Sequence, residues 1–173
     1  MKLVLAGGSS HSDAYAESLL RQQSEQICFL PWTSGEELEE LLSNAALFVL
    51  PSDLEGLSLA LLDAMAAGVC VLTSDIPENN EVVAGAGFTF HRGDQADLES
   101  MLDLLVRDPE LRRQSATRAQ KRIQHEYAWP AIARAIEKSY YEVLGWGPPE
   151  TARRSAACGA PIESVPLSQM PLT

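Results

Sequence analysis

Basic residues are scarce in this 173-residue chain, which carries 13 Lys and Arg against 24 Asp and Glu, a formal net charge of −11. Proteins that bind nucleic acid neutralise its phosphates with Lys and Arg, and no basic stripe interleaved with aromatic residues occurs here. The sequence therefore predicts no nucleic-acid partner.

Long apolar runs are also absent, since no stretch approaches the roughly 18 apolar residues that a membrane-spanning helix needs. The apolar part of the first ten residues, MKLVLAGGSS, is too short for a signal peptide and predicts a first β-strand instead. We therefore expect no membrane span.

Cysteines are few, odd in number and widely spaced, at Cys28, Cys70 and Cys158. No CxxC pair or His/Cys cluster of the kind that holds a metal is present, so we expect neither a metal site nor a bound cofactor. Cys28 and Cys70 fall in apolar runs typical of buried strands. Unpaired thiols are typical of a reducing compartment, and we expect a cytoplasmic location.

The length suits one domain, and the apolar fraction of 46% is enough to form a core. Periodic apolar patterns run through residues 1–144. From Gly145 onward this periodicity is lost, and half of the chain's prolines lie there. Residues 145–173 are therefore predicted to form a flexible tail, in which Cys158 would be exposed and free.

The most informative stretch is residues 47–75. Leu47–Leu50 is an apolar run typical of a buried strand, a helical pattern covers Leu59–Ala67, and Val69–Thr73 has the pattern of a second buried strand. Gly68 stands where the end of a helix favours a left-handed residue. Together these segments predict a βαβ unit with parallel strands.

Polar groups gather where the first of these strands leads into the helix. Gly56, Leu57 and Ser58 place free backbone N–H groups at the helix N-terminus, whose partial positive charge favours an anion. Glu55 directly precedes them. Asp63, inside the helix, is either a carboxylate on the helix rim or one that faces a polar ligand in a cleft.

The rest of the chain alternates between strand and helix patterns. Further strands are predicted at 2–6, 27–30 and 88–91, and further helices at 13–24, 35–45, 94–106, 108–125 and 129–144. Ser34 and Glu37 form a capping-box pattern, and residues 74–81 are predicted to be a loop before a short helical segment at 82–84. This order indicates an α/β fold, a Rossmann-like parallel sheet of about five strands with helices on both faces.

Other candidate residues follow the carboxyl ends of predicted strands, where ligands bind in such sheets. Gly7 and Gly8 form a turn, but neither GxGxxG nor GKS/T is present. Trp32, with Thr33 beside it, could equally stack on a base or fill the core. His91 has no Ser or Cys nucleophile pattern around it, and we interpret it as structural.

The stretch PSDLEGLSLALLDAMAAGVCVLTSD resembles the signature of retaining glycosyltransferases of family 4 (group 1), which have the GT-B fold. That family carries two acidic residues eight positions apart, followed by Ala-Met and Gly. Glu55 and Asp63 have this spacing. The Ala64–Met65 pair and Gly68 fall in register as well. The resemblance covers most of the chain, but only the second half of such an enzyme.

The resemblance implies the donor-binding domain of a nucleotide-sugar-dependent hexosyltransferase, inactive without its acceptor half. Glu55 would be the catalytic residue and would hold sugar hydroxyls. The N–H groups of residues 56–58 would bind the distal phosphate, and Asp63 would accept hydrogen bonds from the ribose. The implied partners are a nucleotide-diphosphate sugar, bound as a substrate, and an N-terminal acceptor domain.

The same resemblance implies roles for the residues that follow the first two predicted strands. Trp32 and Thr33 hold the positions that lie under the nucleotide base in the family. Gly7 and Gly8 correspond to a Gly-rich turn near the donor cleft.

Three features depart from the family pattern. Asp63 stands where Glu is usual and is about 1.5 Å shorter in reach, and Ser58 stands where Gly is common. The Arg and Lys that neutralise the donor diphosphate in the family follow a strand that has no counterpart here. The missing Arg and Lys and the Asp63 substitution favour an alternative, a non-catalytic nucleotide-sugar-binding or protein-interaction module, so enzyme activity of this chain alone stays open. A receiver-like domain with Asp53 as its acid is disfavoured by the Glu-Gly-Leu-Ser motif.

Overall fold

The computed structural model describes residues 1–8 and 13–146. The chain divides into two compact units, Met1–His125 and Glu126–Thr173, which we describe separately. Within the described residues, no helix is long and apolar enough to cross a membrane. From residue 147 on, the predicted tail lies outside the described residues, and so does Cys158.

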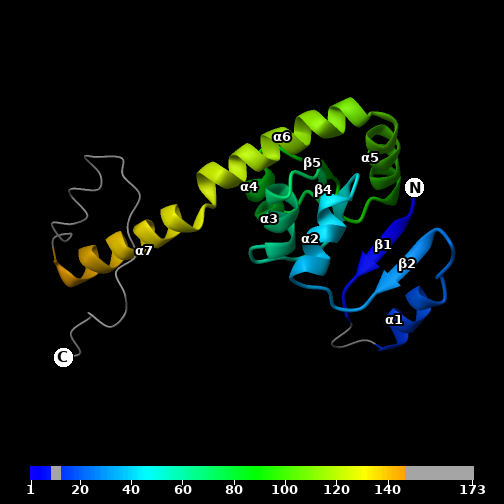
Figure 1. The fold of residues 1–173 in the computed structure, drawn as a ribbon, viewed down its shortest axis with the longest axis horizontal. Coiled ribbons are helices and arrows are strands. Elements are labelled where there is room, and N and C mark those ends of the chain that lie inside the picture. Colours follow the sequence, from blue (N-terminus) through cyan, green and yellow to red (C-terminus); the bar gives the residue numbers. More distant parts are fainter. Residues whose placement is uncertain (9–12, 147–173) are drawn as a thin grey trace. The chain divides into compact units, whose positions relative to one another are not determined.

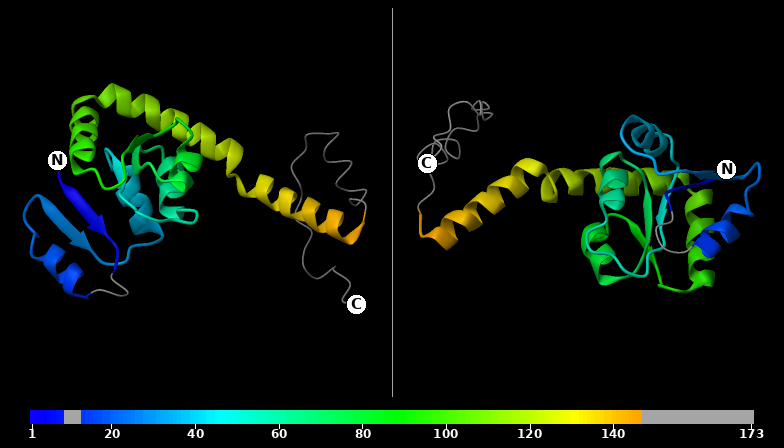
Figure 2. Two further views of the ribbon diagram at one scale, coloured as in Figure 1. Left: turned by 180° about the vertical axis from the view of Figure 1, so that it is seen from behind. Right: turned by 90° about the horizontal axis from the view of Figure 1, so that it is seen from below.

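The first sheet of the larger unit contains two parallel strands (Figures 1 and 2). These strands and the helix between them in sequence are β1 (Leu3–Ala6), α1 (Asp13–Leu20) and β2 (Ile27–Leu30). The apolar side chains of β1 remain largely exposed, at 51% for Leu3, 43% for Val4 and 38% for Leu5. Helix α1 is shorter than the predicted 13–24, because Gln22 and Gln23 already form tight turns back to Leu19 and Leu20.

The second sheet contains three parallel strands, with the central strand between its two neighbours. The strands are β3 (Phe48–Leu50), β4 (Val71–Ser74) and β5 (Phe88–Phe90), and the intervening helices are α2 (Glu36–Ser43), α3 (Leu59–Ala66) and α4 (Pro77–Val83). Every residue of β4 is buried, as expected for a parallel strand covered on both faces.

Three longer helices complete the described chain. They are α5 (Gln95–Arg107), α6 (Pro109–Glu126) and α7 (Trp129–Leu144). Asp94 caps α5, because its carboxylate accepts hydrogen bonds from the N–H groups of Ala96 and Asp97 at 2.9 and 3.0 Å. No residue of α7 is buried, and Trp129 and Tyr140 are among its exposed aromatic side chains.

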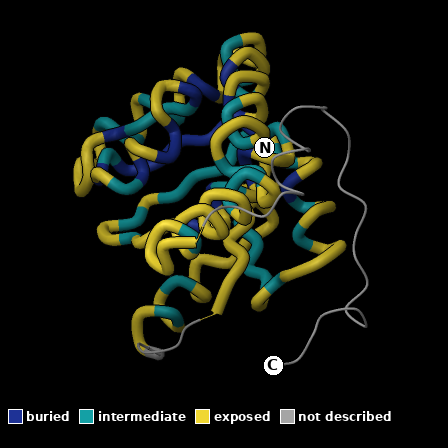
Figure 3. The backbone as a smooth tube through the Cα atoms, turned by 90° about the vertical axis from the view of Figure 1, so that its left-hand side faces the viewer, coloured by how far each residue is buried: buried dark blue, intermediate teal, exposed yellow. Residues whose placement is uncertain are grey.

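The core of the larger unit lies at the second sheet and α5. Its main cluster consists of Cys70, Leu72, Phe90 and Leu105, all of them buried. Figure 3 marks such buried positions in dark blue. On α3, the side chains of Leu61, Ala64 and Met65 are fully buried. Burial of each large apolar side chain contributes roughly 1.5–3 kcal/mol, so these contacts hold the second sheet and its helices together.

Helix α6 is tied to the second sheet and its helices by side-chain hydrogen bonds. Ser115 Oγ donates to the carbonyl of Ala86 at 2.8 Å. Gln120 Nε2 donates to the carbonyl of Ala66, the last residue of α3, at 3.1 Å. The carbonyls at the end of a helix have no partner within it, so α6 supplies one of the missing donors for α3.

The predicted end of α3 at Gly68 is confirmed. Gly68 has a φ of 74°, in the left-handed region. Its N–H donates to the carbonyl of Met65 at 3.2 Å, and that of Val69 donates to the carbonyl of Ala64 at 3.0 Å. This pair of bonds is a Schellman motif, and it turns the chain directly from α3 into β4.

The α/β class and the parallel strands are confirmed, but the five strands form two sheets rather than one. β1 pairs with β2, β3 pairs with β4, and no described strand lies between β1 and β3. Among the described residues, the expected single sheet is therefore divided into a two-stranded and a three-stranded sheet.

Two local predictions are wrong. The capping box at Ser34 and Glu37 does not form, because Gly35 takes the N-cap position with a φ of 60° and no side chain caps α2. The expected loop over 74–81 is mostly the helix α4, which begins at Pro77 because a fixed φ suits the first helical turn.

Candidate functional site

The loop between β3 and α3 carries the predicted motif from the carboxyl end of a strand to the start of a helix. Ser58 is the N-cap residue of α3 and is buried, but its side chain makes no capping bond. Among the described residues, the N–H groups of Gly56, Leu57 and Ser58 have no acceptor. The loop therefore presents three backbone donors beside the positive end of the helix dipole.

A chain of hydrogen bonds holds Glu55 in place. Ser52 Oγ donates to Glu55 Oε1 at 2.7 Å. Ser74 Oγ, at the end of β4, donates to the carbonyl of Ser52. Asn79 on α4 donates its amide to both the carbonyl and the hydroxyl oxygen of Ser74, at 3.2 Å each. Because Ser74 and Asn79 are buried, this network anchors the carboxylate of Glu55 to the core.

A second group of polar residues supports the same loop from the end of β5. Asp75 accepts the backbone N–H of Arg92 at 2.8 Å, and its carboxylate lies 2.8 Å from His91 Nδ1. The guanidinium of Arg92 donates to the carbonyl of Asp53 at 3.2 Å and lies 3.9 Å from its carboxylate. Arg92 thus links the residues after β5 to the loop after β3.

The His91–Asp75 pair shifts both of its ionisations. The hydrogen bond with His91, followed by that from the Arg92 N–H, lowers the pKa of Asp75 below its ordinary value of 3.8. The hydrogen bond with Asp75 raises the pKa of His91 above its ordinary value of 6.5. Because the His91 side chain is 78% exposed, solvent screens this pair, and its main effect is to orient the ends of β4 and β5.

Asp63 lies on the exposed part of α3, away from the buried positions of that helix. Its carboxylate has no hydrogen bond or ion pair within the part of the chain that the structure describes. Nothing in the larger unit holds this side chain in one orientation, in contrast to Glu55.

The remaining candidates lie in the first sheet, at the carboxyl ends of β1 and β2. Trp32 is 79% exposed, so in this structure it does not fill the core. Thr33 Oγ1 donates to the carbonyl of Pro31 at 2.9 Å. Gly7, with Gly8 after it, has a φ of 148°, and its N–H donates to the carbonyl of Leu30 at 3.2 Å. In the described chain no hydrogen bond joins these residues to the Glu55 loop.

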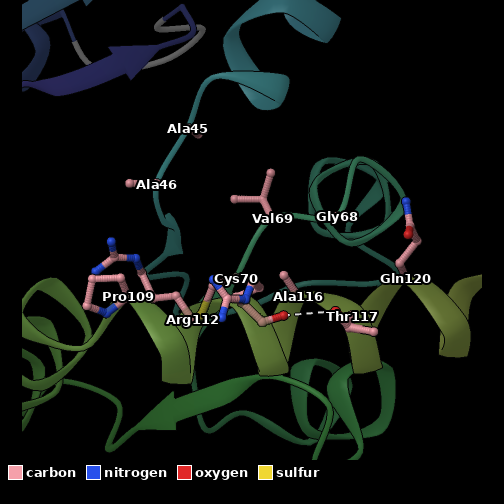
Figure 4. A pocket seen from close by; sticks show the side chains of 11 residues that line it. Ala45, Ala46, Gly68, Val69, Cys70, Pro109, Arg112, Ala116, Thr117 and Gln120 are labelled. Atoms are coloured by element: carbon pink, nitrogen blue, oxygen red, sulfur yellow. Dashed lines mark hydrogen bonds between the residues drawn. The ribbon is translucent and has the colours of Figure 1, made fainter.

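A cavity of 320 Å³ lies elsewhere on the larger unit (Figure 4). Ala45 and Ala46, ahead of β3, line it together with Gly68 and Cys70, ahead of β4, and with residues of α6 such as Arg112. Burial raises the pKa of the Cys70 thiol. The cavity is therefore at the amino ends of these strands, opposite to the end at which α/β sheets bind ligands, and we assign it no role in the site.

The family model for "Glycosyl transferases group 1" matches residues 1–122. The chain belongs to this family. The chain is 29% identical over 158 residues to alpha-maltose-1-phosphate synthase of Mycolicibacterium smegmatis, and the match covers 83% of this chain and 41% of that protein. The chain spans less than half the length of the curated relatives it matches.

Solved glycosyltransferase structures have the same fold. Sucrose-phosphate synthase from Thermosynechococcus elongatus matches with a TM-score of 0.75 and 25% identity, over 83% of this chain and 39% of that chain. Anabaena Alr3699/HepE, solved in complex with UDP, matches with a TM-score of 0.74 and 18% identity, over 82% of this chain and 41% of that chain. The second likeness shows the fold alone.

Sequence reasoning missed the residues that hold the loop. Asn79 lies in the polar run Glu-Asn-Asn-Glu, and nothing in that pattern distinguishes it from its exposed neighbour Asn80. Arg92 and Asp75 could have been noticed from their positions. Asp75 directly follows β4 and Arg92 lies shortly after β5, at the same edge of the sheet as Glu55. The signal available was position at the strand end, and not residue type.

Proposed function

We propose that this glycosyltransferase domain is the donor-binding half of a retaining, family 4 enzyme that uses a nucleotide sugar, and that it is inactive alone. The observation that carries the proposal is the loop before α3. There the carboxylate of Glu55, oriented by Ser52, directly precedes three N–H groups that have no acceptor among the described residues. A carboxylate can accept from sugar hydroxyls, and free N–H groups at a helix N-terminus can bind a phosphate. The UDP complex of Alr3699/HepE, which shares the fold, supports the choice of ligand class.

The proposed site divides the donor into parts. Glu55 accepts hydrogen bonds from hydroxyls of the transferred sugar, and the N–H groups of residues 56–58 bind the distal phosphate. Asp63, in the second turn of α3, accepts from the ribose hydroxyls, since no described residue pairs with its carboxylate. Trp32 and Thr33 lie under the base, and the exposure of Trp32 leaves its ring available for stacking.

Residues after β1 complete this assignment. Gly7 and Gly8 lie near the donor cleft, where the absence of a side chain permits close approach of a ligand to the backbone. The N-terminal acceptor domain and a cytoplasmic location remain predictions.

The chemistry of transfer sets what the loop must do. The bond between the anomeric carbon and a diphosphate oxygen breaks, and the acceptor hydroxyl oxygen forms the new bond to that carbon while its proton passes to an oxygen of the departing diphosphate. The nucleoside diphosphate leaves with the electron pair of the broken bond. In the proposed site this negative charge develops beside the N–H groups before α3, which stabilise the departing group electrostatically. This contribution uses groups of the protein backbone alone.

The second candidate is a module of the same fold that binds a nucleotide sugar, or another protein, without transfer. The shorter Asp63 favours it. The two functions differ in one observable, because a binding module never yields a glycoside, even together with an acceptor domain.

The test of the site is an NMR titration of the 173-residue chain with UDP, GDP and ADP. We expect weak binding, near millimolar or about −4 kcal/mol, with shifts at residues 55–58. Asp63→Ala should weaken a nucleoside diphosphate more than inorganic diphosphate, which has no ribose. Asp103→Ala, an exposed acid on α5, is the matched control and should change neither affinity. Shifts that map away from residues 55–58 and Asp63, or none at several millimolar, would overturn the assignment.

The test of the inactivity is a transferase assay of the same chain with nucleotide sugars. No glycoside should form, because these residues make only one side of a donor site. Turnover by the purified chain would show that the 173 residues hold a complete active site.

A further inference from the structure

The cavity of 320 Å³ lies between helix α6 and the segments that lead into β3 and β4 (Figure 4). Its lining residues on α6 recur every three or four positions, which places them on one face of the helix: Pro109, Arg112, Arg113, Ala116, Thr117 and Gln120. The other lining residues come ahead of β3 and β4, and none of them has a side chain larger than that of Val69. The cavity therefore combines one polar helix face with a wall of small side chains.

Arg112 is a half-buried cation without a counter-charge. Its Nη1 donates to the carbonyl of Leu105 and, at 2.9 Å, to the carbonyl of Val106, both near the end of α5. Within the part of the chain that the structure describes, Nε and Nη2 of Arg112 have no acceptor, and no carboxylate forms an ion pair with it. A partly desolvated charge without a partner is unfavourable, so this position favours an anion.

The unbonded edge of the Arg112 guanidinium is the one that suits an oxyanion. Nε and Nη2 lie side by side, and their two parallel N–H groups match two oxygens of a carboxylate or a phosphate. The two carbonyls on α5 hold Nη1 and so restrict the orientation of the whole planar group. Because less side-chain freedom remains to be lost on binding, the guanidinium is preorganised for a ligand.

The other charges around the cavity are compatible with an anion. No Asp or Glu occurs among the described residues that line it, although the chain as a whole carries a net charge of −11. Arg113 adds a second, exposed cation, which Glu110 pairs with. Burial raises the pKa of the Cys70 thiol, so the thiol stays neutral at pH 7 and adds no negative charge. At the negative end of α3, Gln120 already donates to the carbonyl of Ala66 at 3.1 Å.

We propose that this cavity is a second binding site, for a small compound with a phosphate or carboxylate group, which Arg112 binds through its Nε and Nη2. The volume of 320 Å³ is at the lower end of the range of about 300–1,000 Å³ for small-molecule sites, so the ligand is smaller than a nucleotide sugar. The cavity lies at the amino ends of β3 and β4, whereas Glu55 follows the carboxyl end of β3. This ligand therefore does not compete with a donor bound at the Glu55 loop.

The probes for this site are inorganic phosphate and acetate, titrated separately into the 173-residue chain at pH 7. Sodium chloride keeps the ionic strength constant, so that general screening of surface charges does not change during the titration. The readout is the set of amide shifts in NMR spectra. Saturable shifts at Val69, Cys70, Ala116 and Thr117, with a Kd in the millimolar range, are expected for at least one of the two anions. The anion with the lower Kd then identifies whether the site prefers a phosphate or a carboxylate.

Three variants test the assignment. Arg112→Lys keeps the charge but removes the paired N–H donors, and it should weaken binding by at least about tenfold. Ala116→Leu keeps Arg112 and suits a helix, but its larger side chain fills the cavity and should abolish binding. Lys121→Gln is the matched control, because it removes an exposed positive charge from the same helix at a residue that does not line the cavity. It should leave the Kd unchanged, and the NMR spectrum of each free variant reports whether it is folded.

Three results would overturn the proposal. The first is the absence of saturable shifts with either anion at several tens of millimolar. The second is an unchanged Kd in folded Arg112→Lys or Ala116→Leu, because the anion would then bind elsewhere. The third is a set of shifts confined to residues 55–58, which would assign the anion to the loop before α3 alone. Since the two sites are reported by different amides, failure here leaves the donor site standing, and failure of the UDP titration leaves this cavity standing.

Discussion

Removing the side-chain amide of Asn79 should release the loop that carries Glu55. Asn79 is 1% exposed and donates to the carbonyl and hydroxyl of Ser74, the residue that in turn holds the carbonyl of Ser52. Asn79→Ala loses two hydrogen bonds of about 1 kcal/mol each and leaves the buried Ser74 carbonyl without this donor. We therefore expect a loss of about 2–3 kcal/mol in the free energy of unfolding.

The measurement is urea denaturation of the 173-residue chain, followed by circular dichroism. With a slope of about 2 kcal/mol/M, this loss would lower the midpoint by about 1–1.5 M. Asn80→Ala is the matched control, since Asn80 is exposed and its side-chain amide donates to the carbonyl of Asp75 at 2.9 Å. It should cost no more than about 1 kcal/mol. Equal costs for the two variants would refute the view that Asn79 anchors the network.

Two further predictions concern the ends of β4 and β5. Because the pKa of His91 is raised, the stability that His91 contributes is full below pH 6.5 and is lost as the pH rises through its folded-state pKa. Because the pKa of Asp75 is lowered, the stability that Asp75 contributes is present above pH 3.8 and is lost as the pH falls through its folded-state pKa. His91→Gln should remove the decline above pH 6.5 in urea titrations, and an unchanged decline would assign it to other groups. Gly87→Ala should lower the free energy of unfolding by about 1–3 kcal/mol, because a Cβ there would meet Val71 Cγ2 at 2.5 Å. Gly56→Ala is the control and should be nearly neutral, because a Cβ there meets nothing within 4 Å. Similar urea midpoints for the two variants would contradict this packing argument.

The local elements could be predicted wherever a short-range rule decides them. The end of α3 at Gly68 follows from the left-handed conformation that a helix end favours. The same kind of rule failed at Ser34, because Gly35 takes the N-cap position instead. Neighbouring residues in the sequence therefore decide such positions, and the pattern alone does not show which of two candidates prevails.

The site could be predicted as a motif but not as a network. Glu55 and residues 56–58 were identified because they are contiguous between a strand and a helix. Ser74 and Asn79, which hold Glu55, come from other elements, and their roles depend on tertiary contacts that periodicity does not encode. The division into two sheets was missed for the same reason. Strand patterns predict that strands exist, whereas pairing depends on which strands are present to be neighbours.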